Sequence, residues 1–107
     1  MRVATLRSPV LNFWAAKAAG LKTTDGRNGA ASIHDPETGA AIAFQPSLDW
    51  SQAFPILADE WFDIETVLID WFGPNWPHVE EIREEPLTWF VRAFVALKFG
   101  DEVESQP

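Results

Sequence analysis

An amphipathic helix is predicted near the start of the chain, over residues 10–19. Ser8 is expected to cap this helix, with Pro9 at its first position and Gly20 just past its end. The prediction depends on apolar residues that recur every three or four positions, namely Leu11, Trp14, Ala15 and Ala18.

The strongest helical pattern covers residues 86–99. Pro86 suits the first turn, and Gly100 stands just past the end. Only Thr88, Arg92 and Lys98 are polar, so the predicted helix is apolar on nearly every side. Such a helix lies either at the centre of a core or under a partner protein.

Residues 56–72, between these two helices, fit a helix better than a strand. Their large apolar side chains share one helical face, whereas a strand would mix acids and apolar residues on one face. Helix is favoured, and strand stays open. Just before this segment, Asp49 and Gln52 have the spacing of a capping box. We therefore expect a single helical turn that Asp49 caps and Pro55 closes.

A β-hairpin is predicted from residues 30–34 and 40–44. The connecting Asp-Pro-Glu-Thr-Gly sequence is typical of a hairpin loop. Two to three helices packed against this short antiparallel hairpin or sheet would form a small α+β fold. A length of 107 residues suits a single domain. We place that domain at residues 1–100 and a flexible acidic tail at 101–107.

Composition narrows the classes of function. The chain has no cysteine, which excludes a disulfide scaffold and a thiolate metal site and fits a cytoplasmic protein. The N-terminus lacks the apolar core of a signal peptide. No apolar run approaches the ~18–20 residues of a membrane span, so no membrane association is expected.

Charge is distributed unevenly along the chain. The net charge is −8, with +4 from five bases and one acid in residues 1–34 and −12 from three bases and fifteen acids in residues 35–107. Direct binding of nucleic acid is therefore not expected. Either the basic start packs against the acidic remainder, or the acidic part forms a face that engages a basic partner.

Aromatic residues are unusually frequent. The six Trp and eight Phe residues would dominate the core of so small a domain. Trp is seldom fully buried, so we expect one or two Trp side chains at the surface. Exposed Trp is enriched at binding hot spots.

Three stretches together resemble the NinX-like family of small phage and prophage proteins, whose function is unknown. They are the Leu-Asn-Phe-Trp-Ala-Ala-Lys-Ala-Ala-Gly sequence from Leu11, the Pro-Ser-Leu-Asp-Trp block from Pro46 with the later Pro55-Ile56, and the segment from Arg92 to Val103. Phe54 departs from the glycine usual in the family, and residues 57–85 match poorly. The resemblance implies a phage or prophage origin and an intracellular site of action, but no reaction.

No catalytic signature is found. Ser47, Asp49 and either His34 or His78 supply the residue types of a triad, but the chain lacks a nucleophile elbow. The two isolated histidines lack metal-ligand spacing, and no phosphate-binding loop is present. We therefore expect no enzyme activity, no metal and no cofactor.

The candidate binding surface centres on the loop around Trp50. If the Trp50 ring is exposed, the loop is a binding site; if it lies under the last helix, the loop is a packing element. Arg92 is expected to pair with an acid, either in a structural ion pair or in a polar pocket with Asp49 and Trp50. The possible acid partners are Asp49, Asp101 and Glu102. The proposed surface residues are Ser47, Asp49, Trp50, Gln52, Phe54 and Arg92.

Two functions follow from these features. The first is a non-enzymatic accessory protein that binds an unknown host or phage protein through acidic and aromatic surface. The alternative is a small-molecule binder or enzyme with a pocket near Trp50, Phe54 and Arg92. The oligomeric state stays open.

Overall fold

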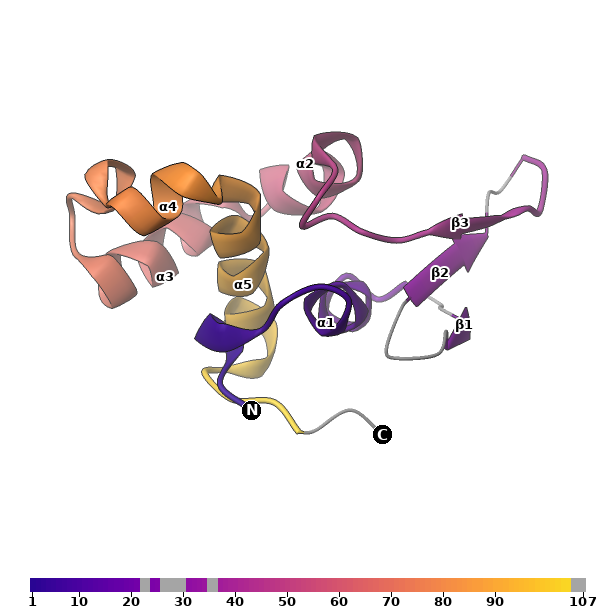
Figure 1. Ribbon diagram of the computed structural model, residues 1–107, viewed down its shortest axis with the longest axis horizontal. Coiled ribbons are helices and arrows are strands. Elements are labelled where there is room, and N and C mark those ends of the chain that lie inside the picture. The colour runs from indigo at the N-terminus through magenta and orange to yellow at the C-terminus, as the bar shows by residue number, and fades with distance from the viewer. Residues whose placement is uncertain (22–23, 26–30, 35–36, 105–107) are drawn as a thin grey trace.

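The computed structural model describes residues 1–21, 24–25, 31–34 and 37–104. In these residues, five α-helices and two short 3-10 helices make up most of the regular structure (Figure 1). The 3-10 helices are η1 (Val3–Thr5) and η3 (Trp76–His78). The α-helices are α1 (Val10–Ala18), α2 (Trp50–Ala58), α3 (Trp61–Phe72), α4 (Glu80–Glu84) and α5 (Pro86–Phe99).

Helix α5 lies at the centre of the helical part and contacts η1 and the other four α-helices (Figure 1). Val91 and Val95 pack in a cluster with residues of η1 and α1. Leu87 and Phe94 pack in a second cluster, with residues of α2, α3 and α4. Burial of each such side chain contributes roughly 1.5–3 kcal/mol. Because α5 serves two clusters, it is apolar on nearly every side, and its predicted range is confirmed.

Helix α1 ends at Ala18, one residue before the predicted end, and Gly20 follows its C-cap as the predicted stop. This glycine has a φ of 72°, a conformation that few other residues adopt readily. The Leu21 N–H donates to the Ala16 carbonyl at 3.0 Å, as in a Schellman motif. At the other end, Pro9 takes the N-cap position, so the prediction that Ser8 caps α1 is wrong.

Residues 56–72 are helical apart from a break at Asp59 and Glu60, which separates α2 from α3. The turn expected after Asp49 is in fact the nine-residue helix α2. The prediction that Pro55 closes this turn is wrong, because Pro55 lies inside α2. The missing Pro55 N–H removes one helical hydrogen bond, and the helix continues past it.

Three short strands lie beside α1, at the end of the molecule away from α3 and α4 (Figure 1). They are β1 (Thr24–Asp25), β2 (Ala31–His34) and β3 (Ala41–Ala43), paired antiparallel in the order β1-β2-β3. The pairing of β2 with β3 aligns Ser32 with Ala43 and is the antiparallel pairing expected of the hairpin. Asp35 and Pro36 of its loop lie outside the described residues.

The predicted α+β fold class is nevertheless wrong, because the described part of the chain is mostly helical. The helices pack chiefly on one another around α5, and not against a β-sheet layer. Among the strand side chains that the structure describes, none belongs to either core cluster. Short, alanine-rich strands offer too little apolar area to hold two or three helices.

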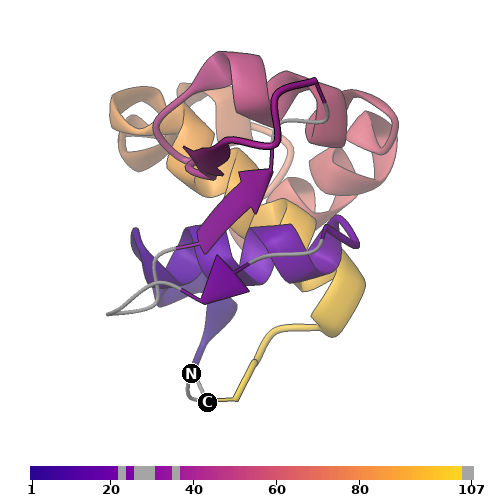
Figure 2. The same ribbon diagram turned by 90° about the vertical axis from the view of Figure 1, so that its right-hand side faces the viewer.

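The two ends of the described chain are paired. The Val3 N–H donates to the Asp101 carbonyl at 2.9 Å, and the Val103 N–H donates to the Met1 carbonyl at 2.9 Å. The last segment, drawn in yellow, accordingly runs back to the N-terminus (Figure 2). The predicted domain boundary at residue 100 leaves these paired residues out. Residues 105–107 lie outside the described part.

Candidate functional site

The loop before α2 is anchored to α1 by a buried amide. Asn12 is only 2% exposed, and its Oδ1 accepts a hydrogen bond from the Ser47 backbone N–H at 3.0 Å. The Asn12 Nδ2 donates to the Ser8 Oγ at 3.0 Å. Buried polar groups need such partners, so these bonds determine where the loop leaves the core. Asn12 was not among the predicted site residues, although a lone amide within an apolar helical pattern is a usable signal.

Asp49 caps α2 as predicted. Its Oδ1 accepts hydrogen bonds from the Ser51 N–H at 2.9 Å and from the Ser51 Oγ at 2.6 Å. The Ser51 hydroxyl, and then the Ser51 N–H, hold the pKa of Asp49 below its ordinary value. These bonds stabilise the helix start, so Asp49 has a structural task here.

Gln52 does not complete a capping box. Its Oε1 accepts from the Gln45 N–H at 2.7 Å, and its Nε2 donates to the Ala43 carbonyl at 2.9 Å. Gln52 therefore connects α2 to the chain that leaves β3. The spacing of Asp49 and Gln52 predicts a capping box, but it does not show whether the Gln52 side chain bonds to the start of its own helix or to another segment.

Trp50 and Phe54 lie at the surface, with 53% and 66% of their area exposed. Both line an open cavity of about 500 Å³, which we call the aromatic groove. Four further side chains complete the lining, from α2, α3 and α5, and none of them carries a charge, hydroxyl or amide. The lining residues are Trp50, Phe54, Leu57, Ala58, Trp61 and Phe90.

The groove is held by edge-to-face ring contacts around Phe90. Its ring centroid lies 5.0 Å from that of Trp61, 6.0 Å from that of Trp50 and 6.1 Å from that of Trp76. Such geometry suits the charge distribution of aromatic rings, and each pair adds roughly 0.5–1.5 kcal/mol beyond area burial. The Phe90 contacts therefore position Trp50 and Trp61 at the surface. Phe90 and Trp61 were not predicted as lining residues, because α5 and α3 reach the groove only through tertiary packing.

Arg92 is not part of this groove. It is 3% exposed; its Nε donates to the Leu6 carbonyl at 2.8 Å, and its guanidinium carbon lies 4.4 Å from the centroid of the Trp89 ring. Burial is the main cause that lowers the pKa of Arg92, nearby Arg7 lowers it further, and Glu85 opposes both.

The predicted acid partners of Arg92 are wrong. In the described residues, none of Asp49, Asp101 and Glu102 forms an ion pair with it. A backbone carbonyl and an aromatic face take the place of a carboxylate. Because Arg92 lies outside the groove lining, the expected pocket of Trp50, Phe54 and Arg92 reduces to the first two.

A second depression, of about 300 Å³, adjoins the groove at Trp50, which lines both. Its lining includes Ser47 and Leu48 from the loop before α2, and Glu84 and Glu85 from the end of α4. Arg7 lies 3.7 Å from a Glu85 carboxylate oxygen. Next to the apolar groove, beyond Trp50, there is thus a rim that carries the carboxylates of Glu84 and Glu85.

The residue types of a triad are not arranged as one. The Ser47 Oγ is buried and has no hydrogen-bond partner in the described residues, so no base activates it. His78 lies on η3 and lines a different depression, with Glu80, Arg83 and Glu84. No group of three His, Cys, Asp or Glu in the described part is placed to hold a metal ion. The His34 side chain and Asp35 lie outside that part.

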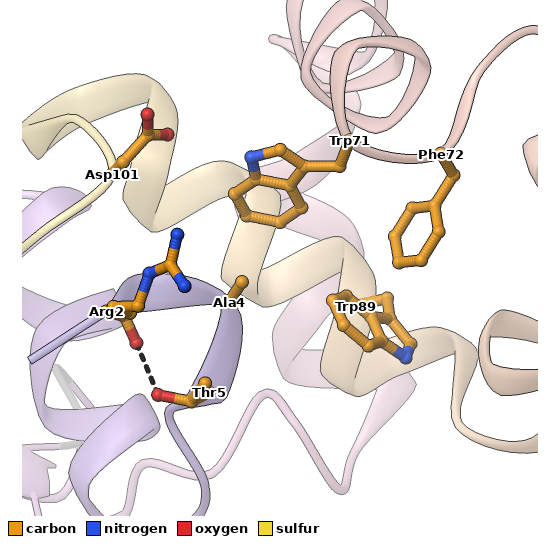
Figure 3. Close-up of a pocket in the computed structure, with 7 residues that line it drawn as sticks. All are labelled: Arg2, Ala4, Thr5, Trp71, Phe72, Trp89 and Asp101. Atoms are coloured by element: carbon orange, nitrogen blue, oxygen red, sulfur yellow. Dashed lines mark hydrogen bonds between the residues drawn. The ribbon is translucent and has the colours of Figure 1, made fainter.

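Another cavity, of about 340 Å³, lies between η1 and the ends of α3 and α5, and sequence analysis did not anticipate it. Figure 3 shows the rings of Trp71, Phe72 and Trp89 on one side and the Arg2 guanidinium, near Asp101, on the other. The Trp89 ring meets that of Phe72 edge-on at 4.8 Å. Here charges of both signs accompany the rings, unlike in the aromatic groove.

Comparisons leave the family open. No family model matches the chain, and no curated protein or solved structure shows significant similarity to it. None of the described helices is long and apolar enough to cross a membrane.

Proposed function

We propose that this protein is a non-enzymatic interaction module that binds another protein through the aromatic groove. The observation that carries the proposal is the exposure of Trp50 and Phe54 side by side on an apolar lining. Monomeric proteins rarely expose large contiguous apolar area without a use for it, and rigid aromatic side chains dominate binding energy at interfaces.

The lining favours a protein partner over a small polar substrate. Sites for small molecules add a few polar groups that orient the ligand. The six side chains of the groove offer only the indole N–H groups of Trp50 and Trp61 for that purpose. The alternative, a small-molecule binder or enzyme at Trp50 and Phe54, therefore has less support.

The biological setting is proposed from the sequence. The blocks around Leu11, Pro46 and Arg92 resemble the NinX-like family, so we propose a phage or prophage accessory protein that acts in the cytoplasm. Its partner is then a host or phage protein. The absence of cysteine suits that compartment.

Selection from a displayed library of random peptides tests the proposal. Wild-type protein should enrich peptides that share an apolar pattern, and Phe54→Ala should lose them. Phe62→Ala is the matched control, because Phe62 is an aromatic residue of α3 that is 85% exposed and does not line the groove. No enrichment, or equal loss with the control, would refute the groove as the binding site.

A further inference from the structure

We propose that the occupant of the aromatic groove is a basic amphipathic helix of a partner protein. This inference depends on the proposed function and specifies its partner. The bound segment has three properties: a helical conformation, an apolar stripe that faces the groove, and Lys or Arg beside that stripe.

Helical conformation follows from the walls of the groove. They are helices α2, α3 and α5, whose backbone groups are largely bonded within each helix, so no strand edge is available for an added strand. Trp50, Phe54 and Ala58 follow one another at four-residue spacing on α2. At 1.5 Å per residue this stripe is roughly 12 Å long, which matches about two turns of a docked helix.

The basic character follows from the charge of the segment that supplies most of the groove and of the depression beside it. Residues 28–82 supply five of the six lining side chains and contain ten acids and no Lys or Arg. Glu84 and Glu85 border the depression that shares Trp50 with the groove. A partner with Lys or Arg beside its apolar stripe would meet these carboxylates, which favours correct orientation and rapid association.

The nearby cations leave part of this acidic rim unpaired. Arg7 pairs with Glu85 at 3.7 Å. Arg83 adjoins Glu84 in sequence, but no base forms an ion pair with Glu84 in the described residues. Of the two carboxylates at this rim, Glu84 is therefore the more available to a partner.

A second copy of this chain fits the groove less well. A dimer through the groove would join two chains that each carry a net charge of −8 and would place the carboxylates of Glu84 and Glu85 at the edge of the interface in both copies. Like charges brought together at an interface oppose association. The charge pattern thus favours a different, basic chain.

Three synthetic peptides of about 14 residues, long enough for the two-turn docking site, test the inference. The first carries Leu at positions i, i+4, i+7 and i+11 with Lys on the flanking positions, the second replaces each Lys by Glu, and the third scrambles the first. Titration calorimetry should give an affinity for the first peptide at least about tenfold higher than for the other two. Phe54→Ala should weaken its binding about tenfold, and Phe62→Ala less than twofold.

Glu84→Gln should weaken binding of the basic peptide about threefold and leave thermal stability unchanged, because Glu84 is exposed. Equal affinity for the basic and acidic amphipathic peptides would overturn the basic partner but leave the interaction module standing. Equal affinity for the scrambled peptide would show attraction by charge alone and overturn docking in the groove. If no peptide binds, the inference fails, while the library selection still decides the proposed function separately. A sedimentation mass that doubles with concentration, and no longer does in Phe54→Ala, would assign the groove to a second copy.

Discussion

The buried amide of Asn12 holds the backbone N–H of Ser47 at 3.0 Å and so joins α1 to the loop that leads into α2. Thirty-five positions separate the two residues in sequence. The same loop presents Trp50 at the mouth of the aromatic groove. A contact inside the core thus determines the position of a side chain at the surface.

Asn12→Ala should lower the free energy of unfolding by about 1–3 kcal/mol, because it leaves the buried Ser47 N–H without a partner. Urea unfolding followed by circular dichroism measures the change. Asn75→Ala is the matched control, since Asn75 is exposed and makes no capping bond through its side chain. Equal stability of the Asn12 variant and wild type would contradict the role given to this amide.

Arg92→Ala should lower the free energy of unfolding by about 2–3 kcal/mol, because it removes the bond to Leu6, the contact with Trp89 and buried volume. Arg92→Met keeps most of that volume and should cost less. Binding through the groove should persist in the Met variant, because Arg92 does not line it. A purified Ala variant that melts at the wild-type temperature would instead count against a structural role.

Asp49 should make stability depend on acid pH. Its hydrogen bonds with Ser51 lower its pKa in the folded protein below the ordinary 3.8, so the unfolded chain takes up the proton first as pH falls. Stabilisation by the ionised carboxylate is therefore complete well above pH 3.8 and is lost as pH falls through the lower folded value.

Asp49→Asn isolates this charge, because Asn also serves as an N-cap. Wild type should be the more stable protein at neutral pH, and the difference should shrink as pH falls below 3.8. Urea unfolding of both proteins across this range measures it. A difference that stays constant with pH would exclude titration of Asp49 as its source.

Pro55→Ala should stabilise the protein by about 1–2 kcal/mol, because it restores one helical hydrogen bond inside α2. This gain should exceed the opposing effect of the greater conformational entropy that the unfolded chain has without the proline, which favours unfolding. Pro86→Ala is the control, since Pro86 stands at the start of α5, where its missing N–H costs no helical bond. Thermal unfolding compares the two. A destabilised Pro55 variant would mean that this proline makes a packing contact that outweighs the lost bond.

Helix bounds and caps were predicted well where they depend on residues within or next to the helix itself. The range of α5 follows from its proline start and glycine end, and the cap at Asp49 follows from residue type and position. Prediction failed where contacts with residues distant in sequence outweigh the local pattern. Pro55 ought to end a helix, but the buried Ala53 and Leu57 on either side of it hold α2 in place. Burial against other helices outweighs one missing hydrogen bond.

Arg92 shows the same limit within the candidate site. A charge on an apolar helix requires a partner, and that much follows from sequence. Which partner it finds depends on where Leu6 and Trp89 come to lie, and a carbonyl oxygen satisfies a guanidinium without any acid in the pattern.

By itself, the sequence determined the central helix, the helix stop at Gly20, the cap at Asp49 and the acidic charge, because each depends on residue type and short-range spacing. Only the tertiary structure decided that the helices gather around α5 and not on a sheet, that Arg92 turns to a backbone carbonyl, and that Trp50 and Phe54 share a groove with Phe90. These outcomes depend on contacts between segments that are distant in the chain. Such contacts are decided by which packing buries the most apolar surface and leaves the fewest polar groups without partners.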